Sequence, residues 1–242
     1  MLEKNITDGF IKTRKAKIYY QITGEGTPLI MLHGNMQDSS FFASQTEFFK
    51  DHFQVIILDS RGHGKSTLGT DSLSINLMAG DVIAFLRHFK IDKCIILGFS
   101  DGGNIALKLA TRIAGKIEAL VVVSANLYPE ALKPLFLFVA QLAVLVTKIL
   151  SFIPPISAMH QKLALMTDPL NINIKKLKSV DIPALLLAGE NDIIEERHTR
   201  EIAGILKKSE LKIISGAGHF LLETNAGEVN EMILEFLEAH KI

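Results

Sequence analysis

The sequence predicts an α/β fold with a mostly parallel central sheet and helices on both of its faces. Short, continuous apolar runs end abruptly in polar, glycine-containing loops, as at 29–32, 55–58 and 95–97. Amphipathic stretches separate most of these runs, and helical periodicity covers roughly 72–89, 102–113, 196–207 and 225–240. Strands that are apolar on both sides and alternate with helices indicate a parallel sheet that is covered on both faces.

The remaining elements fit one domain over residues 1–242. Residues 9–23 alternate weakly and turn near Arg14 and Lys15, which predicts an opening antiparallel hairpin. Further strands are expected at 120–123, 185–187 and 212–214. The alternation breaks between about 126 and 180, where we expect a small helical cap insertion, with a second cap helix around 157–166 after the break at Pro154 and Pro155.

Composition and charge argue against several classes of protein. Lys plus Arg and Asp plus Glu both number 26 and no long basic run occurs, so we expect no nucleic acid partner. Cys94 is the only cysteine, which excludes an internal disulfide and a metal site of several cysteines, and indicates a buried thiol in a reducing compartment. The first ten residues lack the apolar stretch of a secretion signal, so we expect a cytoplasmic protein.

The most apolar segment, 134–153, is long enough to be considered for membrane insertion. Its polar positions fall within a sector of roughly 120° when residues are placed about 100° apart, and they are Lys133, Gln141, Thr147, Lys148 and Ser151. We therefore expect a cap helix with a narrow polar face that is exposed to solvent, and no stable membrane span. Contact with a membrane surface or a second subunit is the alternative for this helix, and we expect a monomer or homodimer.

A G-x-S-x-G pattern at 98–102 places Ser100 between an apolar strand and a helix. A nucleophilic serine needs a strained turn that raises its hydroxyl above the sheet, and the glycines at 98 and 102 allow strand and helix to approach closely. The pattern alone is weak, because glycine-rich turns are common. The alternative is that Ser100 simply caps the following helix.

A serine nucleophile needs a base and a group that orients the base. Of the histidines after Ser100, His219 alone directly follows a strand, whereas His160 lies in the expected cap and His198 and His240 lie in helices. Asp192 follows another strand, with Glu190 as a nearby competitor. The resulting order of Ser100, Asp192 and His219 is the order found in α/β-hydrolases.

We expect the backbone N–H groups of Asn35 and Asp101 to donate hydrogen bonds to an oxyanion. Met36 is the alternative to Asn35. His33 precedes Gly34 at a strand end, and we expect it to form hydrogen bonds within its loop rather than to transfer protons. The polar loop at 59–66 is expected to be a tight turn whose Asp and Arg hold neighbouring backbone.

The chain resembles the α/β-hydrolase superfamily along nearly its whole length. The resemblance rests on HGN at 33–35, DSRGHGKS at 59–66, GFSDGG at 98–103, GEND at 189–192 and GAGH at 216–219, in the order of that family. It implies a Ser100 nucleophile, a His219 general base, an orienting Asp192 and a helical cap. The superfamily includes esterases, thioesterases, peptidases, acyltransferases, lyases and cofactor-free perhydrolases, so the resemblance identifies no substrate.

Asp101 follows the nucleophile, where relatives often have an uncharged residue. One interpretation is structural, because an acid in the first helical turn meets the positive end of the helix dipole. The other is that its charge recognises a cationic group of the substrate. The apolar cap instead suggests aliphatic or aromatic acyl groups, and we expect Met36, Leu135, Phe138 and Leu142 to contact substrate, unless the cap residues only attach cap to core.

Together these observations predict a serine hydrolase that needs no metal and no cofactor. It is expected to cleave a small, fairly hydrophobic carboxylic ester or thioester through an acyl-enzyme, so its partner is a small-molecule acyl substrate. The alternatives are an acyltransferase, a peptidase or a perhydrolase that uses the same three residues. A non-catalytic protein that binds an apolar ligand is the alternative from another class.

Overall fold

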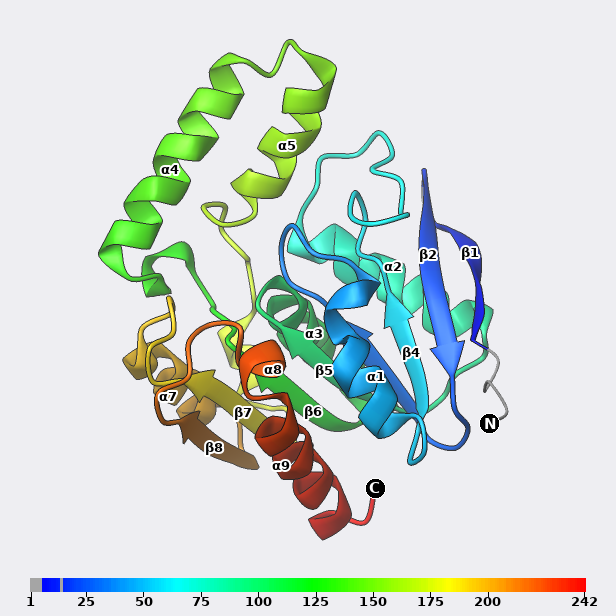
Figure 1. Cartoon of the computed structure of the whole chain (residues 1–242). Helices are drawn as coiled ribbons and strands as arrows, with labels where there is room; N and C mark the ends of the chain where they lie inside the picture. Colours follow the sequence, from blue (N-terminus) through cyan, green and yellow to red (C-terminus); the bar gives the residue numbers. More distant parts are fainter. Residues whose placement is uncertain (1–5, 14) are drawn as a thin grey trace.

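The protein is built around a mostly parallel central sheet (Figure 1). The computed structural model describes residues 6–13 and 15–242. Eight strands within these residues lie in the order β1-β2-β4-β3-β5-β6-β7-β8. They are β1 (Thr7–Thr13), β2 (Ala16–Thr23), β3 (Pro28–Leu32), β4 (Gln54–Leu58), β5 (Cys94–Phe99), β6 (Ile117–Val123), β7 (Ala184–Gly189) and β8 (Ser209–Ile214). The fold class predicted from the sequence is confirmed.

The opening hairpin is also present, because β1 and β2 pair antiparallel up to Thr13 and Ala16. Its turn was expected near Arg14 and Lys15, of which Arg14 lies outside the described residues. β2 continues antiparallel onto β4, and from there to β8 all neighbouring strands are parallel. The carboxyl ends of these parallel strands therefore meet at one edge, where a ligand site is expected.

Helices cover both faces of the sheet. They are α1 (Ala43–Phe49), α2 (Ile75–His88), α3 (Asp101–Ile113), α4 (Pro134–Ile149), α5 (Pro154–Ala164), α6 (Ile174–Leu177), α7 (Glu196–Ile205), α8 (Leu221–Thr224) and α9 (Ala226–Ala239). Short 3-10 turns lie at η1 (Ser39–Phe42), η2 (Ala114–Lys116) and η3 (Pro129–Ala131). The helices expected at 72–89, 102–113, 196–207 and 225–240 correspond to α2, α3, α7 and α9.

The two cores explain why the strands are apolar on both sides. In β3, Ile30 and Leu32 pack with residues of α2 and α3, whereas Leu29 and Met31 pack with α1 and α9 on the opposite face. All four side chains are at most 1% exposed. A strand buried on both faces reads as a continuous apolar run because successive side chains alternate between the two cores.

Between β6 and β7 the chain forms the α4–α5 hairpin, which stands out beyond the sheet (Figure 1). Pro154 and Pro155 do not merely break the chain there, because they form the first turn of α5, where a missing N–H costs little. Within the described part of the chain, no helix is long and apolar enough to cross a membrane. The hairpin occupies the segment in which the cap insertion was expected.

Candidate active site

The turn at Ser100 connects β5 to α3 and holds the serine in an unusual backbone conformation. Ser100 has φ 53° and ψ −118°, which is rarely adopted by a residue with a side chain. A Cβ on Gly98 would collide with the carbonyl oxygen of Gly102, and one on Gly102 would collide with the carbonyl oxygen of Leu32. The side chain of Ser100 makes no capping hydrogen bond to α3. The capping alternative is therefore wrong.

Ser100, His219 and Asp192 form one chain of hydrogen bonds. The Oγ of Ser100 lies 3.2 Å from Nε2 of His219, and Nδ1 of His219 lies 2.7 Å from Oδ1 of Asp192. The geometry favours the tautomer in which Nδ1–H donates to the carboxylate and Nε2 accepts from the serine. The three residues come from the loops after β5, β8 and β7, so the structure brings together the residues that the sequence singled out.

Asp192 is 2% exposed and is surrounded by donors. Ser124 Oγ donates to its Oδ2 at 2.5 Å, and the N–H of Ile194 donates to its Oδ1 at 3.0 Å. Burial by itself raises the pKa of Asp192. The hydrogen bond and charge of His219, together with the hydrogen bonds from Ser124 and Ile194, outweigh this effect and hold the pKa below its usual value. Asp192 therefore stays an acceptor for His219 at neutral pH. Ser124 was missed from the sequence.

The other histidines after Ser100 have separate partners. His160 Nδ1 lies 3.2 Å from Thr147 Oγ1, and His240 Nδ1 lies 2.9 Å from the carbonyl oxygen of Phe236. His198 accepts from the N–H of Leu127. Glu190, the competitor of Asp192, accepts from Ser215 and Gly216 at an exposed position. None of these groups is hydrogen-bonded to Ser100 within the described residues.

A pocket of about 230 Å³ opens over Ser100 and His219. Its apolar lining comes from Met36, Phe99, Leu132, Leu165, Met166, Ile193, Ile194 and Phe220. Polar lining comes from Asn35, Gln37, Asp101 and Asn126. A concave, mainly apolar site with a few polar groups is typical of small-ligand binding.

Three of the expected substrate contacts are not part of this pocket. The side chains of Leu135, Phe138 and Leu142 are 71%, 62% and 51% exposed, and they do not line it in the described structure. The apolar cap side chains that do line it are Leu165 and Met166, which follow α5. The prediction for α4 was wrong because periodicity shows which residues share a face, but not which way that face points. Met36 does line the pocket.

The loop after β3 connects the site to the cap. Asn35 donates from Nδ2 to the carbonyl oxygen of Lys162 in α5 at 2.7 Å, and its Oδ1 lies 3.2 Å from His63 Nε2. His33 lies within 2.7 Å of the carbonyl oxygen of Gly34 and accepts from the N–H of Ser60, so its expected role within the loop is confirmed. Burial lowers the pKa of His33 and takes that of His63 to about 4, so both imidazoles are neutral.

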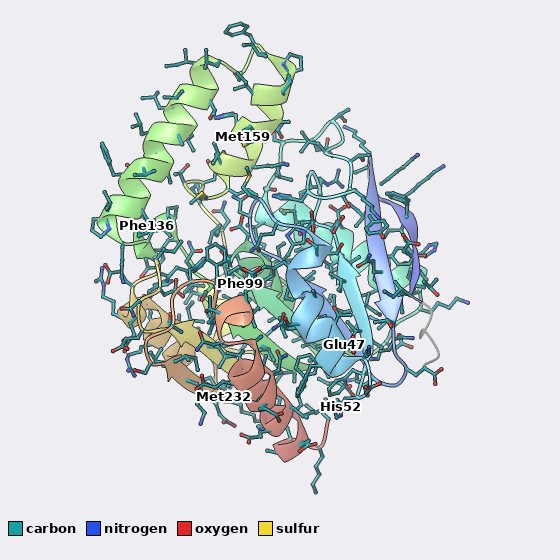
Figure 2. All side chains as sticks on the ribbon, in the orientation of Figure 1. Glu47, His52, Phe99, Phe136, Met159 and Met232 are labelled. Carbon is teal, nitrogen blue, oxygen red and sulfur yellow. The ribbon has the colours of Figure 1, made fainter. Side chains whose placement is uncertain are left out.

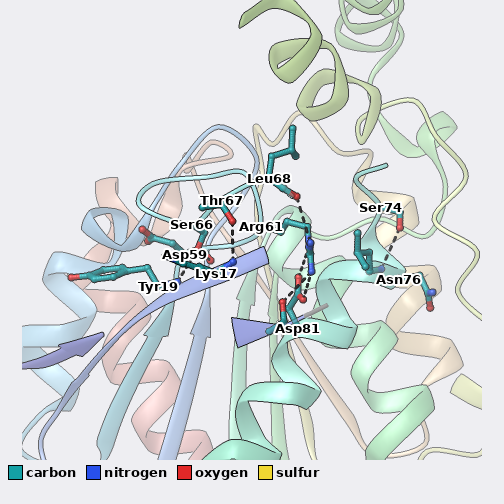
Figure 3. A network of polar contacts seen from close by, with 12 residues as sticks. Lys17, Tyr19, Asp59, Arg61, Ser66, Thr67, Leu68, Ser74, Asn76 and Asp81 are labelled. Carbon is teal, nitrogen blue, oxygen red and sulfur yellow. Dashed lines mark hydrogen bonds and ion pairs between the residues drawn. The ribbon is translucent and has the colours of Figure 1, made fainter. Parts of the chain in front are cut away.

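The loop at 59–66 is structural, as expected (Figure 3). Asp59 accepts from the N–H groups of Ser39 and Lys65, both at 2.7 Å. Arg61 is fully buried and forms two hydrogen bonds with the carboxylate of Asp81, at 2.8 and 2.6 Å. These contacts fix the loop against the edge of the sheet, beside the HGN loop.

Asp101 is 7% exposed and lies in the first turn of α3, beside the pocket. Its Oδ1 accepts from Asn104 at 3.3 Å, whereas Oδ2 is buried without a hydrogen-bond partner in the described residues. Burial raises the pKa of Asp101 to about 6, although Asn104 and His219 act in the opposite direction. Asn104 also contacts Asn126 through two hydrogen bonds, which forms a polar wall that the sequence did not indicate.

A metal-binding cluster is not apparent at the site. Across 6–13 and 15–242, no three side chains of His, Cys, Asp or Glu are grouped so that they could hold a metal ion. Cys94 is buried in β5, and burial raises the pKa of its thiol to about 12.

Comparison with known proteins gives the family. A family model described as the alpha/beta hydrolase fold matches residues 27–173, which is more than half of the chain. The chain belongs to the α/β-hydrolase fold family. The matched region runs from β3 to the segment before α6 and so contains the Ser100 turn and the α4–α5 hairpin.

Two of the relatives reported for this α/β hydrolase cover almost the whole chain. The AB hydrolase superfamily protein YisY of Bacillus subtilis (strain 168) is 25% identical over 94% of this chain and 98% of that protein. A non-heme haloperoxidase of Rhodococcus erythropolis is 25% identical over 92% and 96%, respectively. The sn-1-specific diacylglycerol lipase ABHD11 of Danio rerio is 34% identical, but only over 41% of this chain and 32% of that protein.

Solved structures agree on the fold of this α/β hydrolase. The structure of Est816, described as an N-acyl homoserine lactone degrading enzyme, superposes with a TM-score of 0.79 at 25% identity. It covers 94% of this chain and 100% of the other. These similarities place the protein among hydrolases, and they identify neither the bond that it cleaves nor its substrate.

Proposed function

We propose that the protein is a serine hydrolase that cleaves small, fairly hydrophobic carboxylic esters or thioesters. The observation that carries the proposal is the hydrogen-bonded chain from Ser100 through His219 to Asp192, at the base of an apolar pocket. A serine hydroxyl is a weak nucleophile until a neighbouring base takes its proton. His219 is placed to do so, and Asp192 stabilises the imidazolium that forms.

In the proposed reaction, His219 Nε2 takes the hydroxyl proton of Ser100 while Oγ attacks the acyl carbon. The backbone N–H groups of Asn35 and Asp101 hold the resulting oxyanion. Collapse breaks the bond to the alcohol or thiol, which leaves with the proton from His219. Water then gives a proton to His219 and attacks the acyl-enzyme, which releases the carboxylic acid and returns the proton to Ser100.

The pocket supports an acyl group of modest size. Its volume of about 230 Å³ lies below the range of roughly 300–1,000 Å³ that is typical for drug-sized ligands. Leu132, Leu165 and Ile194 provide apolar contact for an acyl chain, and the oxygen atoms of an ester meet the polar lining residues Asn35 and Asn126. An ester-cleaving role also agrees with the lactone-degrading activity named for the similar structure.

An organophosphonate probe tests this proposal directly. We expect one covalent adduct per chain, and peptide mapping should place it on Ser100. Ser100→Ala should abolish labelling, whereas the matched variant Ser215→Ala, at an exposed site, should label fully. A folded protein that is not labelled would indicate a binding protein and would overturn the proposal.

A further inference from the structure

The outer face of α4 is apolar although it faces water. Seven large side chains of this helix are between 47% and 71% exposed: Leu135, Phe138, Val139, Leu142, Leu145, Val146 and Ile149. At 3.6 residues per turn they fall within one sector of roughly 120°, and that sector holds no polar residue. We call these seven residues the α4 apolar face. Isolated exposed apolar residues need no explanation, but a contiguous set of this size marks a binding surface.

Only part of the polar side of the helix lies toward its own neighbours, because Gln141 and Lys148 are exposed. Ala140 is the buried residue of α4, and Thr147, from the sector expected to be wet, lies 3.2 Å from His160 of α5. The α4 apolar face points the opposite way, and the α4–α5 hairpin extends beyond the sheet (Figure 1). None of the seven residues lines the pocket over Ser100, and the labels Phe136 and Phe99 mark α4 and the pocket in Figure 2. This face therefore plays no part in the proposed hydrolysis.

Charge along the same hairpin indicates the kind of partner. From 131 to 167 the sequence contains Lys133, Lys148 and Lys162 but no Asp or Glu, although the whole chain is neutral. Apolar side chains continue at the distal end of α4, where Phe152 is 78% exposed. Lys148 is exposed next to this face, whereas Lys162 lies by the loop of Asn35. An apolar face on a hairpin whose only charged side chains are cationic complements an anionic lipid surface, where the apolar groups enter the acyl boundary and Lys148 remains among the headgroups.

We propose that the α4 apolar face docks the protein onto the surface of a bilayer that contains anionic phospholipids. A second copy of the chain is a poorer partner, because two copies would bring together two hairpins with only positive side chains. With 16 residues, α4 lies in the interface rather than across it.

The chain offers a clean optical test because it contains no tryptophan. Leu142→Trp places a single reporter on the α4 apolar face, and Phe10→Trp places a matched one on β1, where the original side chain is 53% exposed. We expect vesicles of equal parts phosphatidylglycerol and phosphatidylcholine to shift the emission of Leu142→Trp to the blue, with little effect of phosphatidylcholine alone. Phe10→Trp should not respond.

Flotation of the full chain with the same vesicles measures binding. Leu145→Glu should lower the partition coefficient roughly tenfold or more, whereas Phe10→Glu should not. Lys148→Gln should lower it about fivefold and exposed Lys207→Gln should not, because each lysine near an anionic surface contributes about this factor. Unchanged thermal unfolding of each variant separates lost docking from lost folding.

Three outcomes would overturn the proposal. The first is that neither vesicle type binds the protein. The second is that Leu145→Glu and Phe10→Glu weaken binding equally. The third is that Leu142→Trp emits in the blue without vesicles, in proportion to protein concentration, which would show that a second copy covers the face.

Discussion

Ser124 lies in the turn after β6 with φ 53° and is 1% exposed. Its hydroxyl donates to Asp192 Oδ2 and so fixes the carboxylate that orients His219. No spacing rule pointed to it, because its role depends on β6 and β7 being neighbours in the sheet. Ser100, Asp192 and His219 were predictable since each directly follows an apolar strand.

Replacing Ser124 should therefore weaken catalysis without closing the pocket. Ser124→Ala removes a hydrogen bond to a charged group, and we expect kcat for a short p-nitrophenyl ester to fall about tenfold with little change in KM. Ser124→Ala should also raise the pKa of Asp192, because the carboxylate loses a hydrogen-bond donor that holds this pKa low. Ser215→Ala is the matched control, and equal activity of the two variants would contradict this role.

Asp101 should make the protein less stable as pH rises. Its folded-state pKa of about 6 exceeds the ordinary 3.8, so the folded protein binds more protons than the unfolded chain between these values. Stability from this group is full below pH 4 and is lost as pH rises through 6. The free energy of unfolding of Asp101→Asn should therefore exceed that of the wild type at pH 8, by at most about 3 kcal/mol, and should equal it near pH 4. Thermal melts at both pH values check this.

The control for this prediction is Asp92→Asn, at a position where the side chain is 92% exposed. A constant difference between Asp101→Asn and wild type across pH would contradict the expectation. Turnover of neutral esters should hardly change in Asp101→Asn. Selective loss of activity toward amino-acid esters would instead support the recognition of a cationic group.

At the scale of the element, apolar periodicity located the strands and the main helices within a few residues. It failed for α4, whose polar sector was expected to be the side that faces water. Thr147 of that sector lies against α5, and the apolar side of the helix is exposed as well. A helical pattern defines faces but not their neighbours, and α4 has no partner in the described chain that covers its apolar face. The break expected at Pro154 and Pro155 is present between α4 and α5, and the two prolines also start α5.

The close approach of β3, β5 and α3 should depend on glycine. Gly102→Ala places a methyl group against the carbonyl oxygen of Leu32, so the turn at Ser100 must shift. We expect the free energy of unfolding to fall by more than about 2 kcal/mol and most of the activity to be lost. Gly80→Ala is the matched control in α2, where nothing lies within 4 Å of the new Cβ. It should stabilise the protein by up to about 1 kcal/mol. Denaturant unfolding measures both, and a tolerated Gly102→Ala would contradict the packing argument.

At the scale of the whole molecule, the parallel sheet gathers residues that are far apart in sequence at one edge, and the α4–α5 hairpin stands above it (Figure 1). The pocket size follows from how closely that hairpin approaches the loop of Asn35. No pattern in the sequence encodes this distance, so the lining by Leu165 and Met166 could not be predicted.

A series of p-nitrophenyl esters of increasing acyl length should reflect this size. We expect kcat/KM to be highest for the shorter esters and to fall for the longest ones, because the pocket of about 230 Å³ limits the length of acyl chain that it can enclose. Rising activity up to the longest esters would show that the hairpin moves or that the acyl chain lies elsewhere.

The most direct test of the central claim is to trap the acyl-enzyme on Ser100. Rapid acid quenching of the enzyme with p-nitrophenyl butyrate, followed by peptide mass spectrometry, should show one butyryl group on the peptide that contains Ser100, and none in Ser100→Ala. Consumption of the ester by the folded wild-type protein without this adduct, or with the acyl group on another residue, would contradict it.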